Sequence, residues 1–181
     1  MEMPAPNASV LSRKDLIVDR LRAVLPDDAI MADIAETRAY ECDALTAYKC
    51  PPLCAVLPSN TAEVSAVLKI CHELEVPVVP RGSGTSLAGG ALPTADCVIL
   101  GVAKMSDVLE TNYDDRYIKV QTGRTNLSVT GAVETNSFFY APDPSSQLAC
   151  AIAGNIAMKS CCAQSLIYSV TTNNQMGVSK E

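Results

Sequence analysis

The chain has 181 residues, the size of one domain, and 48% of them are hydrophobic, enough to bury a core. Lys and Arg number 14 and Asp and Glu number 20, which gives a net charge of −6. This acidic balance, with no Trp and only two Phe, argues against nonspecific nucleic-acid binding. No apolar run approaches the roughly 20 residues of a membrane span, and the polar start does not resemble a secretory signal. We therefore expect a globular, cytoplasmic protein with no membrane span.

Eight cysteines raise the question of metal or disulfide chemistry. Without an export signal, reduced thiols are the expected state. The one metal-like cluster contains Cys42, Cys50, Cys54 and the pair Cys71-His72. It lacks the closely spaced cysteine pairs that zinc sites prefer. We therefore predict no metal site.

In the first half, the pattern predicts a helix over 13–25, a strand over 54–57, a helix over 61–75 and a strand over 76–79. The helix over 61–75 carries apolar residues at i, i+3, i+4 and i+7, which form one helix face. The order strand–helix–strand favours a parallel strand pair with the helix packed on the sheet.

In the second half, strands are predicted over 97–102, 108–113 and 117–122, followed by a helix over 125–134 and a short strand over 138–140. The turn residues Asp114-Asp115-Arg116 separate the second strand from the third, which is typical of a hairpin. The expected fold class is therefore α+β with a mixed sheet.

A glycine-rich stretch follows the strand over 76–79 at once. Glycines let the backbone take positive φ and turn successive amide groups towards one concavity, which binds an anion such as phosphate. Two common phosphate motifs do not match, because no Lys follows the glycines as in a P-loop and Leu87 replaces the third glycine of the dinucleotide fingerprint. The alternative is a tight connection between strands, with glycines for geometry alone.

A second loop covers residues 141–155. Pro142 and Pro144 preset the backbone angle φ, and Asp143 and Ser145 can cap turns. Small residues then dominate 149–154, so that another molecule could approach the backbone closely. The alternative interpretation is a small-residue helix packed on the sheet.

Together these segments resemble a known family. Pro80-Arg-Gly-Ser-Gly-Thr-Ser-Leu-Ala-Gly-Gly-Ala-Leu-Pro93 and Tyr140-Ala-Pro-Asp-Pro-Ser-Ser-Gln-Leu-Ala-Cys150 are similar to two loops of the FAD-linked oxidases of the vanillyl-alcohol oxidase/p-cresol methylhydroxylase (PCMH) type. Tyr40-Glu-Cys-Asp43 fits the group that contains the FAD-binding chain of bacterial glycolate oxidase and the D-lactate dehydrogenases. The resemblance covers about residues 16–155.

This resemblance implies two small α/β subdomains with FAD between them. It implies an N-terminal helical segment over 1–50 and a PCMH-type FAD-binding domain over 51–181. The residues expected to wrap the FAD pyrophosphate are Arg81, Gly82, Ser83, Gly84, Thr85, Ser86, Gly89 and Gly90. Those expected to line the second wall, towards the ribityl chain and flavin, are Pro142, Asp143, Ser145, Gly154 and Asn155.

The implied chemistry is oxidation of a 2-hydroxy acid such as glycolate or D-lactate. Some relatives attach flavin covalently through a His in the first loop, but Leu87 and its neighbours offer none, so non-covalent FAD is expected. Other oxidase subunits would be partners, and through them the protein would lie at a membrane.

The chain departs from the family pattern in two places. Cys161-Cys162 replace twin glycines, and Ser169 replaces a glycine after Tyr168. The chain also stops at Glu181, whereas family members continue, so we expect a C-terminally incomplete domain in which no catalytic residue can be named. A 2-hydroxy acid would then bind only if the substrate domain is supplied. The alternative is a truncated, non-catalytic remnant or interaction module without flavin.

Overall fold

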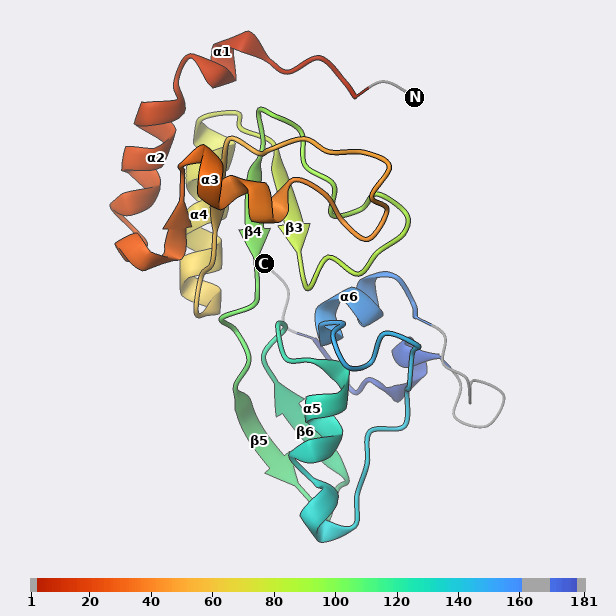
Figure 1. The fold of residues 1–181 in the computed structure, drawn as a ribbon. Helices are drawn as coiled ribbons and strands as arrows, with labels where there is room; N and C mark the ends of the chain where they lie inside the picture. The colour runs from red at the N-terminus through yellow and green to blue at the C-terminus, as the bar shows by residue number, and fades with distance from the viewer. Residues whose placement is uncertain (1–2, 161–169, 179–181) are drawn as a thin grey trace. The chain divides into compact units, whose positions relative to one another are not determined.

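A computed structural model describes residues 3–160 and 170–178 (Figure 1). The chain packs as two units, one formed by residues up to Val102 and one that begins at Ala103. This division describes how the chain packs. The domain boundary at 50/51 that the family resemblance implied is a different one and stays a prediction. The replaced glycines at 161–162 and 169 lie outside the described residues.

The first unit is built on a four-stranded sheet. Its strands are β1 (Ile30–Met31), β2 (Cys54–Val56), β3 (Val78–Arg81) and β4 (Val98–Gly101), in the order β1-β2-β4-β3. Both β2 and β3 run parallel to β4, and β1 runs antiparallel to β2. The sheet is therefore mixed, as predicted.

The predicted parallel direction of β2 and β3 is confirmed, but their expected adjacency is wrong, because β4 lies between them. All four residues of β4 are buried, as expected of a central strand covered on both faces. Pro80 has no amide hydrogen to give to a second neighbour, which suits β3 to the edge of the sheet.

Helix α4 (Thr61–Glu73) connects β2 to β3, and Asn60 caps it by accepting a hydrogen bond from the Glu63 amide. Its buried residues Val67, Ile70 and Cys71 join the main core. The predicted helix over 13–25 forms as α2 (Lys14–Arg22), and a further short helix, α1 (Ala8–Leu11), precedes it. Asn7 starts α1 earlier than the apolar pattern indicated, because its side chain accepts from the Ser9 amide. The remaining helices of this unit are the 3₁₀ turn η1 (Asp27–Ala29), α3 (Ile34–Thr37) and η2 (Arg38–Tyr40).

The core of the first unit contains several thiols. Cys54, Cys71 and Cys97 are buried and free. Burial raises the pKa of the Cys54 thiol to about 12 and that of Cys71 to about 11, which keeps both protonated. Over the ranges 3–160 and 170–178, no group of three or more His, Cys, Asp or Glu side chains could hold a metal ion.

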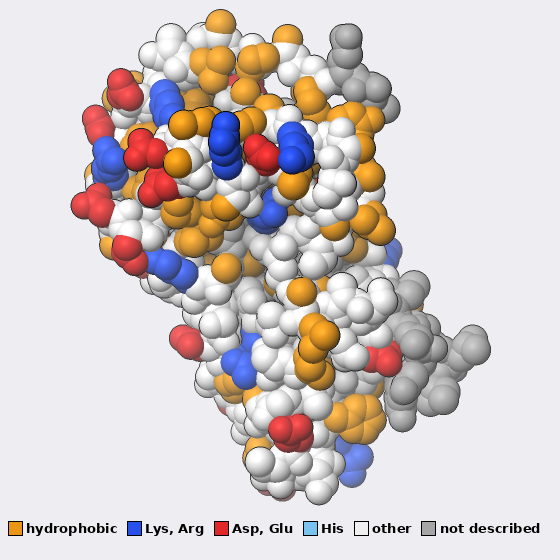
Figure 2. Space-filling model, viewed as in Figure 1, with side chains coloured by type: hydrophobic (Ala, Val, Ile, Leu, Met, Phe, Trp, Pro, Cys, Tyr) orange, Lys and Arg blue, Asp and Glu red, His pale blue; other side chains and the backbone are white. Residues whose placement is uncertain are grey.

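Acidic and basic side chains are interspersed on the face shown in Figure 2. At the surface of the first unit, Arg20 pairs with Glu73 at 2.8 Å and so connects α2 to α4. Exposed pairs of this kind contribute little to stability. None of the described helices combines the length and hydrophobicity that a bilayer crossing requires.

The second unit begins with the predicted hairpin, β5 (Val108–Asn112) paired antiparallel with β6 (Tyr117–Val120). Helix α5 (Asn126–Gly131), the 3₁₀ turn η3 (Glu134–Asn136), α6 (Ile152–Ala157) and the 3₁₀ turn η4 (Thr171–Asn174) follow. The strand predicted over 138–140 is wrong, because this segment joins no ladder in the described part of the chain. The Tyr140 amide donates instead to the Thr130 hydroxyl at 3.0 Å.

Candidate cofactor-binding site

The glycine-rich loop begins where β3 ends. Because β2, β3 and β4 are parallel, their carboxyl ends lie at one edge of the sheet, and β3 leads into the loop at Arg81 (Figure 1). In open α/β sheets, this edge is where ligands usually bind. The order of elements alone therefore places the loop in a suitable position.

Two glycines of the loop have backbone angles that L side chains rarely adopt. Gly84 has a φ of +71° and Gly89 a φ of +76°. A Cβ on Gly84 would lie 2.6 Å from Arg81 Cζ, whereas a Cβ on Gly89 would meet nothing within 4 Å. Gly84 therefore packs against the protein, and Gly89 borders open space. Between these two positions the loop forms neither a helix nor a strand.

Most amide groups of this loop have no acceptor in the part of the chain that the structure describes. The Ala88 amide donates to the Ser86 hydroxyl at 3.1 Å. Among the described residues, no group accepts a hydrogen bond from the backbone amides of residues 82–87, Gly89 or Gly90. Unpaired amides on a curved, partly exposed backbone form an anion-binding nest, so these residues fit a diphosphate.

The Arg81 side chain has protein partners instead. Its Nη1 donates to the carbonyl of Cys42 at 2.7 Å and to the carbonyl of Ala91 at 3.3 Å. Its guanidinium also lies 5.6 Å from the centre of the Tyr40 ring. Burial raises the pKa of Tyr40, and the Arg81 charge opposes that rise. That Arg81 wraps a pyrophosphate stays a prediction.

The segment 40–45 packs against the loop, a role that its residue types do not predict. The Ala44 amide donates to the Gly84 carbonyl at 2.9 Å. Asp43 is only 4% exposed, and its Oδ1 accepts from the Leu45 amide at 2.9 Å. In the sequence, Tyr40-Glu-Cys-Asp43 supports only the family resemblance, because nothing in its composition indicates contact with residues so far along the chain.

The second set of predicted site residues lies in the second unit. An isolated bridge joins Thr125 to Ala151, and the Ile152 amide donates to the Arg124 carbonyl at 2.9 Å, which fixes the start of α6. A Cβ on Gly154 would meet nothing within 4 Å, so the helix surface there is open and low in bulk. The small-residue helix of the alternative interpretation therefore forms. A ligand-facing role for its open surface remains compatible with this helix.

Two buried polar atoms in this region have no partner among the described residues. Asn155 is 2% exposed, and its Nδ2 lacks an acceptor. Asp143 Oδ1 likewise lacks a donor. Pro142 is buried, and Ser145 is exposed. Buried polar groups are normally paired, so these two atoms indicate a surface whose hydrogen bonds the described residues do not complete.

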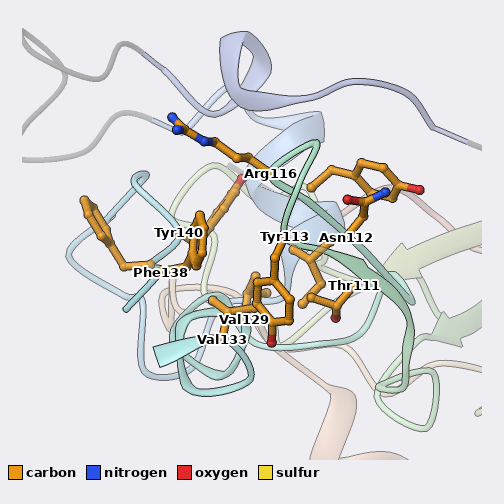
Figure 3. A pocket seen from close by; sticks show the side chains of 11 residues that line it. Thr111, Asn112, Tyr113, Arg116, Val129, Val133, Phe138 and Tyr140 are labelled. Atoms are coloured by element: carbon orange, nitrogen blue, oxygen red, sulfur yellow. The ribbon is translucent and has the colours of Figure 1, made fainter. Parts of the chain in front are cut away.

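The second unit also has a small hollow between the hairpin, α5 and the segment 138–140. Its volume is about 90 Å³, and Tyr113 and Phe138 lie across it with their ring centres 5.5 Å apart (Figure 3). A volume of this size admits a few water molecules and is too small for a nucleotide. We therefore regard this hollow as a packing gap.

A loop that is curved by glycines, lies at the carboxyl ends of parallel strands and has several amides without an acceptor among the described residues is typical of proteins that bind a phosphate-bearing cofactor. The sequence profile of the family described as "FAD binding domain" matches residues 52–179. The chain belongs to this FAD binding domain family, and FAD is its cofactor.

Similar proteins with known names support this family assignment. Glycolate oxidase subunit GlcD of Escherichia coli (strain K12) is 43% identical over 158 residues, which make up 87% of this chain and 32% of that protein. D-lactate dehydrogenase of Archaeoglobus fulgidus is 34% identical over 140 residues, which make up 72% of this chain and 31% of that protein. The chain thus spans about a third of the length of these relatives.

Solved structures share the fold. Alkyldihydroxyacetonephosphate synthase superposes with a TM-score of 0.81 at 19% identity, over 96% of this chain and 33% of the other. p-Cresol methylhydroxylase with substrate bound gives a TM-score of 0.71 at 21% identity, over 86% and 31%. These similarities confirm the PCMH-type α+β fold that the resemblance implied.

Proposed function

We propose that this chain is the FAD-binding part of a flavin-dependent oxidoreductase that acts on 2-hydroxy acids such as glycolate or D-lactate. The observation that carries the proposal is that no acceptor among the described residues bonds the amides of residues 82–87, Gly89 and Gly90. The names of the relatives support the substrate class. Because those relatives are about three times as long, the reaction would belong to a longer protein or to a complex.

In this proposal the glycine loop holds the diphosphate. The backbone amides of residues 82–87, Gly89 and Gly90 would donate to its oxygens, and the hydroxyls of Ser83, Thr85 and Ser86 would add donors. Gly89 would let the phosphate approach the backbone, since nothing fills the space beside it. These contacts anchor the cofactor and do not depend on the chemistry of the flavin ring.

In the same proposal, the residues of the predicted second wall would also contact the cofactor. Asn155 Nδ2 supplies a buried donor, and Gly154 supplies an open surface. Pro142, Asp143 and Ser145 belong to the same proposed wall. When bound, the flavin supplies hydride acceptance from the α-carbon of the substrate, and the protein positions it.

We further propose that the FAD is held without a covalent bond. The loop contains no histidine, and the exposed Leu87 occupies the region where some relatives carry one. Acid precipitation of the loaded protein should therefore release all flavin into the supernatant. Flavin that stays with the pellet would contradict a non-covalent site.

The remaining partners also belong to this proposal. Other oxidase subunits would join the complex, as the word subunit in the relative's name suggests. A 2-hydroxy acid would bind only where the substrate domain is supplied. The protein would act in the cytoplasm, or at a membrane through those subunits.

The test has two stages. First, the purified chain is titrated with FAD, and binding is followed by quenching of flavin fluorescence; saturable binding is expected. Second, the protein is combined with the remaining two thirds of a relative, and bleaching of the flavin band by glycolate, D-lactate or L-lactate is compared without oxygen. A folded chain that takes up no FAD would favour the alternative, a non-catalytic remnant or interaction module.

A further inference from the structure

Arg81 lies at the centre of the contacts between the glycine loop and the segment 40–45. We propose that Arg81 is a positioning residue that shapes the diphosphate-binding loop from its inner side, without itself touching phosphate. This inference rests on the proposed FAD site and assigns a role within it. It also gives Arg81 a role different from that of the other loop residues, which the motif predicts to wrap the pyrophosphate together with it.

The first argument is the number of segments that one guanidinium joins. Nη1 bonds Cys42 O at 2.7 Å and Ala91 O at 3.3 Å, so the same group holds the neighbouring segment and the far end of the loop. Arg81 itself is the first residue before the loop. Both ends of the loop are therefore connected through a single side chain, which closes the backbone into its curve.

The second argument is the packing of Gly84 on this guanidinium. A Cβ at Gly84 would lie 2.6 Å from Arg81 Cζ and 3.0 Å from Nε, well inside van der Waals contact. The Gly84 carbonyl meanwhile accepts from the Ala44 amide at 2.9 Å. The backbone at Gly84 is thus fixed from two sides, and its own amide has no acceptor among the described residues.

The third argument is the shape of the side chain. A guanidinium is planar and has several donors, so it can stack over the Tyr40 ring while it bonds two carbonyls. A lysine would keep the charge but not this geometry. If Arg81 acts by positioning, the charge of a lysine at this position should therefore not restore the shape of the loop.

The first experiment needs no cofactor. Hydrogen exchange of the full chain is measured for the Ala44 amide, which depends on the position of Gly84 O. Arg81→Met should speed its exchange at least tenfold, and Arg81→Lys should do nearly the same. Arg22→Met, which removes an exposed guanidinium of α2, is the control and should leave it unchanged. Unchanged exchange at Ala44 in Arg81→Met overturns the proposal.

The second experiment is a pair of double-mutant cycles read out as the FAD dissociation constant. Gly84→Ala and Gly89→Ala impose a side chain at nearly the same φ, but only the first meets Arg81. We expect Gly84→Ala to cost at least fivefold less in the Arg81→Met background than in the wild type, whereas Gly89→Ala should cost the same in both. The proposal is overturned if Gly84→Ala and Gly89→Ala both cost the same in the Arg81→Met background as in the wild type. Wild-type affinity for FAD in Arg81→Lys also overturns it.

These readouts separate the two ideas. A wild-type chain that binds no FAD contradicts the proposed function, while the exchange at Ala44 still decides the role of Arg81. If Arg81→Met does not fold, as judged by circular dichroism, Arg81→Lys takes its place in both experiments. In that case Gly84→Ala should also weaken FAD binding at least fivefold more than Gly89→Ala, and equal losses contradict the proposal.

Discussion

The amide of Ala44 donates to the carbonyl of Gly84 at 2.9 Å, which joins two segments that lie far apart in the sequence. Among the described residues, the amide side of the glycine loop stays largely free of protein acceptors. The loop therefore presents donors to a ligand while its carbonyl at Gly84 is already satisfied. This arrangement and the core beneath it can be tested by four sets of variants.

Gly89→Val should lower the affinity for FAD at least tenfold. A β-branched residue at a φ of +76° costs about 1–2 kcal/mol, and its methyl groups would fill the space that now lies open beside the backbone. Isothermal titration with FAD measures the change. Gly131→Ala is the control, because Gly131 lies in α5 with a similarly open environment and no positive φ. Equal affinity in the valine variant would remove Gly89 from the site.

Asn155→Ala should weaken FAD binding roughly fivefold, which corresponds to the loss of one hydrogen bond worth about 1 kcal/mol. Its Nδ2 is buried and has no acceptor among the described residues, so its removal breaks no protein bond at that atom. Without FAD, the thermal midpoint of the variant should therefore stay close to that of the wild type, although its affinity for FAD falls. The exposed Asn136 in η3 provides the matched control. If both asparagine variants bind FAD alike, Asn155 does not face the cofactor.

Asn60→Ala should destabilise the first unit by about 1 kcal/mol, because Asn60 Oδ1 accepts from the Glu63 amide at the start of α4. Asn60→Ser keeps a capping acceptor and should recover most of this loss. Urea denaturation monitored by circular dichroism measures both. A serine variant as unstable as the alanine variant would show that the cap itself is unimportant.

Stability should fall as the pH rises from about 9 towards 12. In the unfolded chain the Cys54 thiol ionises near its ordinary pKa of 9.0, whereas burial holds the folded pKa at about 12. The unfolded state therefore loses a proton that the folded state keeps, which favours unfolding within this window and has no effect below it. The pKa of Cys71, raised to about 11, acts in the same direction.

Denaturation midpoints measured at intervals between about pH 7 and pH 11 check this prediction, since the thiol linkage acts only above the unfolded pKa. The variant Cys54→Ala/Cys71→Ala lacks both thiols, so its stability should decline less steeply above about pH 9 than that of the wild type. Cys42→Ala, which removes a thiol that is only partly buried, serves as the control for the loss of a cysteine. Parallel curves for the wild type and the double variant would exclude the thiols of Cys54 and Cys71 as the cause.

Local sequence signals predicted the local structure well. The apolar spacing in 61–75 corresponds to α4, and the turn at 114–116 corresponds to the β5–β6 hairpin. These features depend on residues close together in the chain. The strand expected over 138–140 failed because the Tyr140 amide bonds the Thr130 hydroxyl, an interaction that no local pattern contains.

By itself, the sequence determined the glycine loop as an anion-binding candidate, because glycines permit positive φ and free amides bind phosphate. The family and its cofactor came from the resemblance of two loops to known FAD-linked oxidases, which the match to the FAD binding domain family confirms. Tertiary structure decided that β4 lies between β2 and β3, since only the sheet determines which strand is covered on both faces. It also decided that Arg81 turns towards Cys42 and Ala91. A side chain's direction depends on partners brought together by folding, and motif spacing carries no information about them.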